Sequence, residues 1–286
     1  MTYTTPVEYI LTLSCPDQRG IVRAVSGFLS ERECNILDSA QFGDTLTGNF
    51  FMRVHFVAEG DSAEALRAEF HPLGRDYQMD WKIQDASVRP RVLLLVSKIG
   101  HCLNDLLYRK SSGLLHADVR GVVSNHTDFE DLSHAHGIPF HHLPVTADTK
   151  AEQEQRLLEI VERENIELVV LARYMQVLSP ELCRALRGRI INIHHSFLPS
   201  FKGARPYAQA HARGVKLIGA TAHFVTDDLD EGPIIEQDIV RVAHSLTAEQ
   251  FTAIGRDVEC VVLARAVDWF VHHRILQNGD KTVVFD

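Results

Sequence analysis

Two polar side chains at one end of an apolar run have the types needed for chemistry at a carbonyl group. They stand in Ile191-Asn192-Ile193-His194, whose alternation predicts a strand. In a strand, Asn192 and His194 point to one face and the isoleucines to the other. An amide N–H stabilises a carbonyl oxygen that gains negative charge, and an imidazole moves protons near neutral pH. These two residues suit half of an acyl-transfer site, although a turn-capping Asn192 and a core His194 are open alternatives here.

A second stretch, residues 221–233, adds a histidine and a group of carboxylates. Alternation places Thr221, His223 and Val225 on one strand face, where His223 is a polar exception in an otherwise apolar strand. Four acidic residues follow within 227–231, and Gly-Pro closes the loop. Charged loops are usually just solvated, but this short loop is able to hold one carboxylate in the same cleft as the histidines.

Elements that position these residues follow from the apolar pattern of the second part of the chain. Short apolar runs alternate there with helical patterns, which predicts a mainly parallel sheet with crossover helices. Small ligands bind such sheets outside the carboxyl ends of the strands, which is where both stretches fall. Strands are expected at 92–96, 118–123, 140–143, 168–172, 190–193, 221–225 and 234–240, and helices at 102–110, 151–164, 180–186, 206–213 and 248–276.

The first part of the chain predicts a separate domain. Its strands are expected at 7–15, 36–42, 50–57 and 77–83, and its helices at 21–33, with Asp17 as the N-terminal cap, and 62–73. This βαββαβ order predicts a ferredoxin-like plait. The polar segment 86–90 predicts a linker, so the expected domains are residues 1–85 and 91–286.

Composition places the chain among ordinary globular proteins. Its 286 residues are 45% hydrophobic and 23% charged, and 38 acidic against 29 basic residues give a formal charge of -9. That excess of acid disfavours binding to nucleic acid or to an anionic membrane. The five scattered cysteines lack C-x-x-C spacing, and no signal peptide or long apolar stretch occurs. A cytoplasmic protein without a disulfide framework is therefore expected.

The two chemistry-bearing stretches also carry a family resemblance. The pairing of I-N-I-H-x-S-x-L-P with H-F-V-T-D-x-L-D-x-G-P-I resembles the folate-dependent formyltransferases, over residues 91–241. The resemblance implies a Rossmann-like formyltransferase domain and assigns its functional triad to Asn192, His194 and Asp230. Residues 96–109, the doubled histidine at 194–195 and residues 203–207, behind the N-terminal plait, resemble the formyltetrahydrofolate deformylases in particular.

Roles for further residues are implied by this resemblance. The pterin of the substrate is expected between two loops, one with Met175, Gln176, Val177 and Leu178 and the other with Val225, Thr226, Asp227 and Leu229. These are core residues at strand ends on the plainer interpretation. His223 and Thr221 are expected to support the site from behind. Lys202 and Arg205 meet the glutamate tail of the folate or are solvated surface.

The resemblance further implies hydrolysis of 10-formyltetrahydrofolate to formate and tetrahydrofolate, which supplies formate for purine synthesis and balances one-carbon folate pools. No cofactor and no metal are expected, since the folate is itself the substrate and no histidine stands in an H-E-x-x-H pattern. Two alternatives are a formyltransferase that uses an amine acceptor and a sensor with a silent folate domain. Where ribonucleotide-using relatives hold the acceptor's phosphate, this chain has the bulkier Ser97-Lys98-Ile99-Gly100-His101, which favours water as the acceptor. Neutralisation of a phosphate by Lys98 or His101 is the open alternative.

The start of the first helix resembles another known family. Asp17-Gln18-Arg19-Gly20-Ile21 after a strand is similar to the opening of ACT regulatory domains, which bind amino acids at paired interfaces. The resemblance implies a regulatory ligand at Asp17, Arg19, Gly20 and Ile21, with glycine and methionine as effectors and a homodimer or homotetramer as the assembly. A dimerisation module without a ligand is the alternative.

Overall fold

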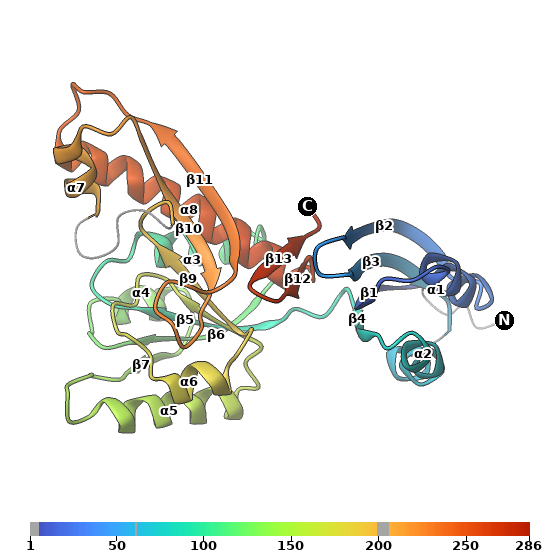
Figure 1. Cartoon of the computed structure of the whole chain (residues 1–286). Helices are drawn as coiled ribbons and strands as arrows, with labels where there is room; N and C mark the ends of the chain where they lie inside the picture. Colours follow the sequence, from blue (N-terminus) through green and yellow to red (C-terminus); the bar gives the residue numbers. More distant parts are fainter. Residues whose placement is uncertain (1–5, 61, 199–205) are drawn as a thin grey trace. The chain divides into compact units, whose positions relative to one another are not determined.

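The computed structural model describes residues 6–60, 62–198 and 206–286 (Figure 1). The chain forms two compact units, which we call the first unit (Met1–Arg89 with His272–Asp286) and the second unit (Pro90–Val271). The chain therefore passes from one unit to the other twice. None of the helices in the described ranges is long and apolar enough to span a membrane.

A four-stranded antiparallel sheet forms the centre of the first unit. Its strands run in the order β2-β3-β1-β4, which is the order of the ferredoxin-like plait and confirms the predicted fold. The elements are β1 (Val7–Pro16), α1 (Ile21–Ser30), β2 (Asn35–Asp44), β3 (Asn49–Ala58), α2 (Ala63–Asp76) and β4 (Asp80–Asp85).

Strand alternation decides which side of this sheet the two helices cover. Alternate residues of β1 and β3, such as Leu11 and Val54, lie in one core with Phe28 of α1 and Phe70 of α2. The two phenylalanine rings meet edge to face, with centroids 5.0 Å apart. Helices α1 and α2 therefore pack on the same face of the sheet.

The start and the end of α1 differ from the prediction. Gly20, in the left-handed conformation at φ 95°, occupies the N-cap, and no side chain caps the helix. Asp17 is exposed and is held instead by its backbone N–H, which donates to the carbonyl of Gly48 at 2.8 Å. The helix ends at Ser30 rather than at 33, because Glu33 is also left-handed and the Cys34 N–H donates back to the Leu29 carbonyl.

Residues 272–286 belong to the first unit, although the sequence placed them in the second domain. They form a hairpin of β12 (Ile275–Asn278) and β13 (Lys281–Val284). Arg53 of β3 donates to the His272 carbonyl at 3.2 Å, and Asn278 donates to the Asp44 carboxylate at 2.7 Å. The preceding helix, α8 (Ala248–Val271), accordingly ends before the predicted 276.

The second unit contains a seven-stranded, mainly parallel sheet, as predicted. Its strand order is β11-β10-β9-β8-β5-β6-β7, and only β10 pairs antiparallel, with both of its neighbours. The elements are β5 (Arg91–Val96), α3 (His101–Ser111), β6 (Asp118–Ser124), α4 (Glu130–Ala135), β7 (Phe140–His142), α5 (Lys150–Arg163), β8 (Leu168–Leu171), α6 (Pro180–Ala185), β9 (Ile190–His194), α7 (Pro206–Arg213), β10 (Leu217–Phe224), β11 (Ile234–Arg241) and α8. The short α4 is not among the predicted helices.

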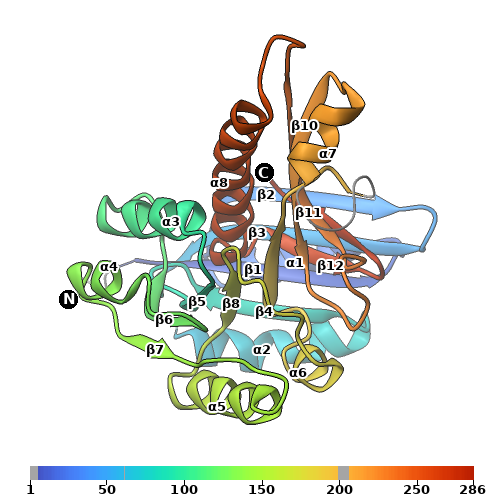
Figure 2. The same cartoon turned by 90° about the vertical axis from the view of Figure 1, so that its left-hand side faces the viewer.

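Helices cover both faces of this sheet (Figure 2). Leu157 of α5 and Leu182 of α6 lie in one core with Leu93 and Val169 of the sheet. Helices α3 and α8 pack together on the opposite face, where α8 crosses β9, β10 and β11. Strands β6 and β7 extend the sheet to one side of β5, and β8 and β9 extend it to the other side. The loops that follow β5 and β8 therefore diverge, which is the usual place for a ligand.

Candidate active site

A cavity of about 320 Å³ lies at the carboxyl ends of β8 and β9. The structure brings to it the three residues predicted for catalysis and the eight predicted to contact the pterin, together with His223. They are Asn192, His194, Asp230, Met175, Gln176, Val177, Leu178, Val225, Thr226, Asp227 and Leu229. Met175, Val177 and Leu229 are more than half exposed, at 57%, 57% and 63%. Exposed apolar side chains beside buried polar groups form a suitable wall for a flat heterocycle.

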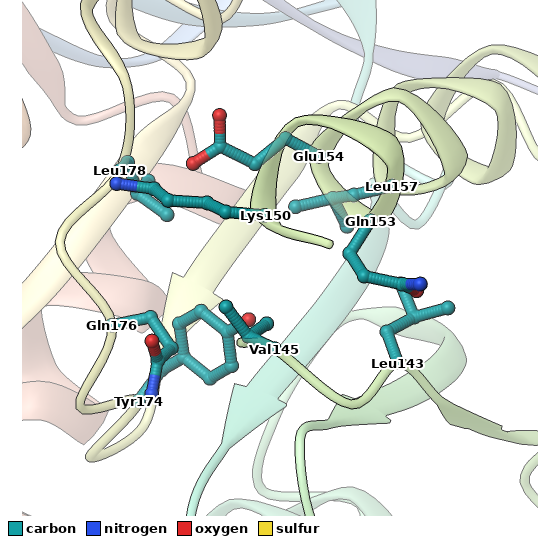
Figure 3. Close-up of a pocket in the computed structure, with 9 residues that line it drawn as sticks. All are labelled: Leu143, Val145, Lys150, Gln153, Glu154, Leu157, Tyr174, Gln176 and Leu178. Carbon is teal, nitrogen blue, oxygen red and sulfur yellow. The ribbon is translucent and has the colours of Figure 1, made fainter. Parts of the chain in front are cut away.

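A second, much smaller cavity adjoins the same loop (Figure 3). Tyr174, Gln176 and Leu178 line it from the loop after β8, and Gln153 and Glu154 line it from α5. Its volume of about 10 Å³ is at the lower limit for one water molecule. The larger cavity is therefore the one with room for a folate.

The amide of Asn192 is oriented by His223. The Asn192 Nδ2 lies 3.2 Å from Nε2 of His223, and the other ring nitrogen, Nδ1, lies 2.8 Å from the carbonyl oxygen of Phe224. A carbonyl only accepts, so Nδ1 carries the proton and Nε2 accepts from the Asn192 amide. Burial lowers the pKa of His223, which keeps the ring neutral in this tautomer. The second amide proton of Asn192 is then free for a substrate oxygen.

His194 and Asp230 form a pair beside this amide. Nδ1 of His194 lies 3.2 Å from Oδ1 of Asp230, and the histidine is buried while the aspartate side chain is 16% exposed. The hydrogen bond from His194, with its charge, holds the pKa of Asp230 below its ordinary value. Among the described residues, Nε2 of His194 has no hydrogen-bond partner. One ring nitrogen is thus fixed by the carboxylate, and the other is buried without a partner in the described part of the protein.

The backbone holds Asp230 in place. Asp230 is in the left-handed region at φ 58°, which an aspartate tolerates better than most residues. Two residues later the chain passes so close to β10 that a Cβ at Gly232 would collide with the Phe224 carbonyl oxygen. The Phe224 N–H also donates to the Pro233 carbonyl at 2.9 Å. Glycine at 232 therefore lets the loop turn its carboxylate back toward the histidines.

Thr221 supports the site without lining the cavity. It is fully buried, and its hydroxyl donates to the Ser196 carbonyl at 3.0 Å. The same oxygen accepts from the Leu198 N–H at 3.1 Å and from Gln237 at 2.9 Å. Thr221 thus ties the segment that follows β9 to the sheet, directly after His194 and His195.

Arg173, the first residue of the loop predicted to contact the pterin, and His195, from the doubled histidine, also line the cavity, although the sequence did not predict what either side chain does there. His195 contacts the His194 ring, with centroids 5.1 Å apart. Burial, and then the charge of Arg173, lowers the pKa of His195 to about 4, so this ring is neutral near pH 7. The doubled histidine was the available signal for His195. Arg173 shows its special position only in its backbone, which is left-handed at φ 68°.

The residues predicted to bind a regulatory ligand differ in their exposure to solvent. Asp17, Arg19 and Gly20 are exposed at the start of α1. Ile21, at 2% exposure, lies in the core of the first unit, so its side chain does not face a ligand. Lys202 and Arg205, predicted near the glutamate tail or the solvent, lie outside the described residues.

Within the described ranges, one group of side chains has the spacing of a possible metal site: His101, Cys102 and Cys260, whose ligand atoms lie within 4.8 Å of one another. Nε2 of His101, however, lies 2.9 Å from the Glu259 carboxylate. A hydrogen bond with Cys260, together with burial, raises the pKa of Cys102. His101 and Cys102 are thus each held by a neighbouring side chain.

Comparison with known proteins agrees with the division into two units. A family model described as formyl transferase matches residues 90–267, and one described as ACT domain matches residues 9–69. Formyltetrahydrofolate deformylase of Corynebacterium sp. (strain P-1) is 50% identical, covering 97% of this chain and 98% of its own, and that of Bacillus subtilis (strain 168) is 48% identical, covering 96% and 93%. A crystal structure of formyltetrahydrofolate deformylase from Burkholderia mallei superposes with a TM-score of 0.95 at 57% identity, covering 98% of this chain and 100% of that one. Glycinamide ribonucleotide transformylase 1 from Symbiobacterium toebii reaches a TM-score of 0.65 at 29% identity and covers 69% of this chain and 95% of that one.

Proposed function

The chain belongs to the formyltetrahydrofolate deformylase family and hydrolyses 10-formyltetrahydrofolate to formate and tetrahydrofolate, and from that premise we propose that Asn192, His194 and Asp230 carry out the hydrolysis. The observation that carries the proposal is that these three side chains, from β9 and the loop after β10, line one cavity. A transferase with an amine acceptor is not favoured, because the deformylases of Corynebacterium sp. and Bacillus subtilis cover 97% and 96% of this chain, whereas the transformylase structure covers 69%.

Asn192 acts on the formyl oxygen. As water adds to the formyl carbon, that oxygen gains negative charge, and the amide proton not bound to His223 donates to it. His223 keeps the amide in this orientation before the substrate arrives. One such preorganised donor typically lowers the barrier by about 3 kcal/mol.

His194 and Asp230 move the protons. Water forms a bond to the formyl carbon and gives up a proton, the bond from that carbon to N10 breaks, and N10 leaves with a proton. Asp230 holds Nδ1 of His194, so Nε2 is the nitrogen that exchanges protons with the reacting groups. Asp230 also positions the attacking water, being ionised across the neutral range.

The folate lies between the loop after β8 and the loop after β10. Met175, Val177 and Leu229 provide the exposed apolar surface against the pterin. Backbone groups and Gln176 provide donors and acceptors that read the edge of its ring. The formyl group then lies toward the buried end of the cavity, where the histidines are.

The reaction scheme uses no cofactor and no metal, since each step has a side chain that performs it. Full activity after treatment with a strong chelator supports this part of the proposal. Loss of activity that returns with added zinc contradicts it.

The experiment that tests the function is an assay of formate release. Purified protein receives 10-formyltetrahydrofolate with no acceptor, and formate and tetrahydrofolate are followed together. Equal amounts of both products are expected. Turnover that depends on an added amine would show a transferase, and absence of both activities would show a sensor.

The first unit is proposed to regulate this activity, on the strength of its match to the ACT domain model. Glycine and methionine are the proposed effectors, bound near the exposed residues Asp17, Arg19 and Gly20 at an interface between chains of a homodimer or homotetramer. A cytoplasmic location is proposed because all five cysteines are free. Formate release at increasing concentrations of each amino acid, with the assembly measured by light scattering, tests the regulation.

A further inference from the structure

Open α/β sheets usually bind a ligand where the strand order reverses, in the crevice between the two diverging loops. In the second unit that place lies between the loop after β5, which begins at Ser97, and the loop after β8, which begins at Ala172. The folate cavity opens beside it, between the loops after β8 and β10. The crevice itself is therefore the natural place for a second substrate.

Direct hydrogen bonds join the two loops across this crevice. The Ser97 N–H donates to the Arg173 carbonyl at 3.1 Å, and the Ser97 hydroxyl accepts from the Met175 N–H at 2.9 Å. That hydroxyl donates in turn to Asn125 Oδ1 at 2.7 Å. Ser97 is 3% exposed, so these bonds are shielded from water. The crevice is closed by the protein itself.

Two nitrogen-bearing side chains near the crevice, those of His101 and Arg173, are paired with one carboxylate. Nε2 of His101, the first residue of α3, lies 2.9 Å from Oε2 of Glu259, and Nε of Arg173 lies 3.4 Å from the same oxygen. The other carboxylate oxygen accepts from the Tyr207 hydroxyl at 2.8 Å. Glu259 comes from the middle of α8 and is 1% exposed. One buried carboxylate thus holds groups from three separate segments.

Interactions with His101 and Arg173 stabilise the ionised form of the buried Glu259. Burial alone opposes its ionisation, but the hydrogen bond from His101 and the charge of Arg173 hold its pKa below the ordinary value. A buried ion pair is strongly destabilised when one partner is removed, because the other charge is left without compensation. Without Glu259, Arg173 would be a buried cation facing both the crevice and the folate cavity.

We propose that Glu259 determines the co-substrate: by holding Arg173 and His101 it keeps these two side chains from binding an anionic acceptor, so water takes the formyl group. The inference rests on the proposed function, because it concerns which co-substrate reaches the folate. Glu259 does not touch the reacting atoms and is a positioning residue.

The test uses the full chain with Glu259→Gln, which keeps the shape and removes the charge, and inorganic phosphate as the anionic probe. Formate release and the thermal unfolding midpoint are measured with and without phosphate at constant ionic strength. In the wild type, phosphate is expected to change neither. In the variant, the released Arg173 and His101 side chains are expected to bind phosphate at least about tenfold more tightly, which appears as inhibition and as a raised midpoint.

Three controls separate charge from general damage. Glu164→Gln removes a carboxylate that pairs with Arg120 at 3.1 Å elsewhere in the second unit, and phosphate is expected to leave it unaffected. Tyr207→Phe removes one hydrogen bond from Glu259 without changing the charge, and the same result is expected. The double variant Glu259→Gln/Arg173→Gln removes both charges, and the phosphate effect of the single variant is expected to disappear.

Several results would overturn the inference. Phosphate sensitivity of the wild type that Arg173→Gln abolishes would mean that the cation is already free. An absence of any phosphate effect in a folded Glu259→Gln protein would mean that the carboxylate does not keep anions out. Should that variant not fold, the wild-type measurement still decides, since it needs no substitution at 259. Failure of formate release in the wild type concerns the proposed function alone, because the shift in the unfolding midpoint is read without turnover.

Discussion

The two units use buried polar side chains differently. In the second unit, His194, His223, Thr221 and Glu259 are each no more than 6% exposed, and all lie around the cavity of about 320 Å³ or directly behind it. In the first unit, the buried Arg53 and Asn278 bond the C-terminal hairpin to the plait. The residues proposed to bind an effector there are exposed.

This contrast shows that the free-energy cost of burying polar side chains helps to identify a functional site. Burying a polar group without a partner is unfavourable. A cluster of buried polar side chains that lines a cavity therefore indicates a functional site. Exposed polar residues at the start of a helix carry no such cost, so their presence alone does not indicate a ligand-binding site. The catalytic assignment is therefore supported by energetics as well as by resemblance, whereas the effector site rests on resemblance alone.

The largest expected effect comes from breaking the His194–Asp230 pair. Asp230→Asn is expected to lower kcat by about 10² to 10⁴-fold, because proton transfer loses its carboxylate. The control is Asp118→Asn, an exposed aspartate beside Arg120 at the edge of the sheet, and its kcat should match the wild type. Single-turnover formate release measures the step. Wild-type turnover in Asp230→Asn would exclude this residue from catalysis and weaken the contrast between the units.

Removal of the oxyanion donor ranks next. Asn192→Ala is expected to lower kcat by about 10² to 10³-fold with little change in KM, since the amide acts when charge develops on the formyl oxygen. Steady-state kinetics separates the two constants. An increase in KM with unchanged kcat would instead make Asn192 a ground-state folate ligand.

The second unit should also show a pH-dependent free energy of unfolding, because of His195. The pKa of His195 falls from 6.5 to about 4 on folding, so between these values the unfolded chain binds more protons than the folded one. The free energy of unfolding should therefore decrease as the pH falls from about 6.5 to about 4, with up to about 3 kcal/mol from this residue. Urea unfolding of the wild type and of His195→Asn across this range measures the difference. Equal pH dependence of the two proteins would show that His195 is not responsible.

The smallest expected effect lies in the first unit. Asp17→Ala should change the free energy of unfolding by no more than about 0.5 kcal/mol, because Asp17 is exposed and does not cap α1. A capping aspartate would cost about 1 kcal/mol. Thermal unfolding decides between them, and formate release without an effector should be unchanged. A loss of 1 kcal/mol or more would mean that the carboxylate stabilises the helix start after all.

Strand alternation and two motifs were enough to predict most of the fold and the groups that meet at the cavity. Alternation in 190–193 oriented Asn192 and His194 correctly, because a strand leaves a side chain only two directions. The position of Asp230 needed the family resemblance, since its turn depends on the close passage of Gly232 against Phe224. No local pattern encodes that contact.

The missed features depend on partners distant in sequence. Glu259 interrupts an apolar helical run, which was a visible signal, but its partners His101, Arg173 and Tyr207 are distributed over three other segments. The hairpin of β12 and β13 was overlooked although Gly279-Asp280 is a typical two-residue hairpin loop, because the apolar pattern of α8 was extended to residue 276, into β12. Helix periodicity alone does not show which unit a segment joins.

The return of residues 272–286 to the first unit has a consequence for synthesis on the ribosome. The plait receives its bonds from His272 and Asn278 only after the whole second unit has been translated. Until then the nascent plait lacks the hairpin that satisfies Arg53, and the later-made unit has time to fold alone. The first unit thereby receives its last contacts after the second unit has been made, so a chain cut short before residue 272 would carry a complete second unit joined to a first unit that lacks the bonds from His272 and Asn278.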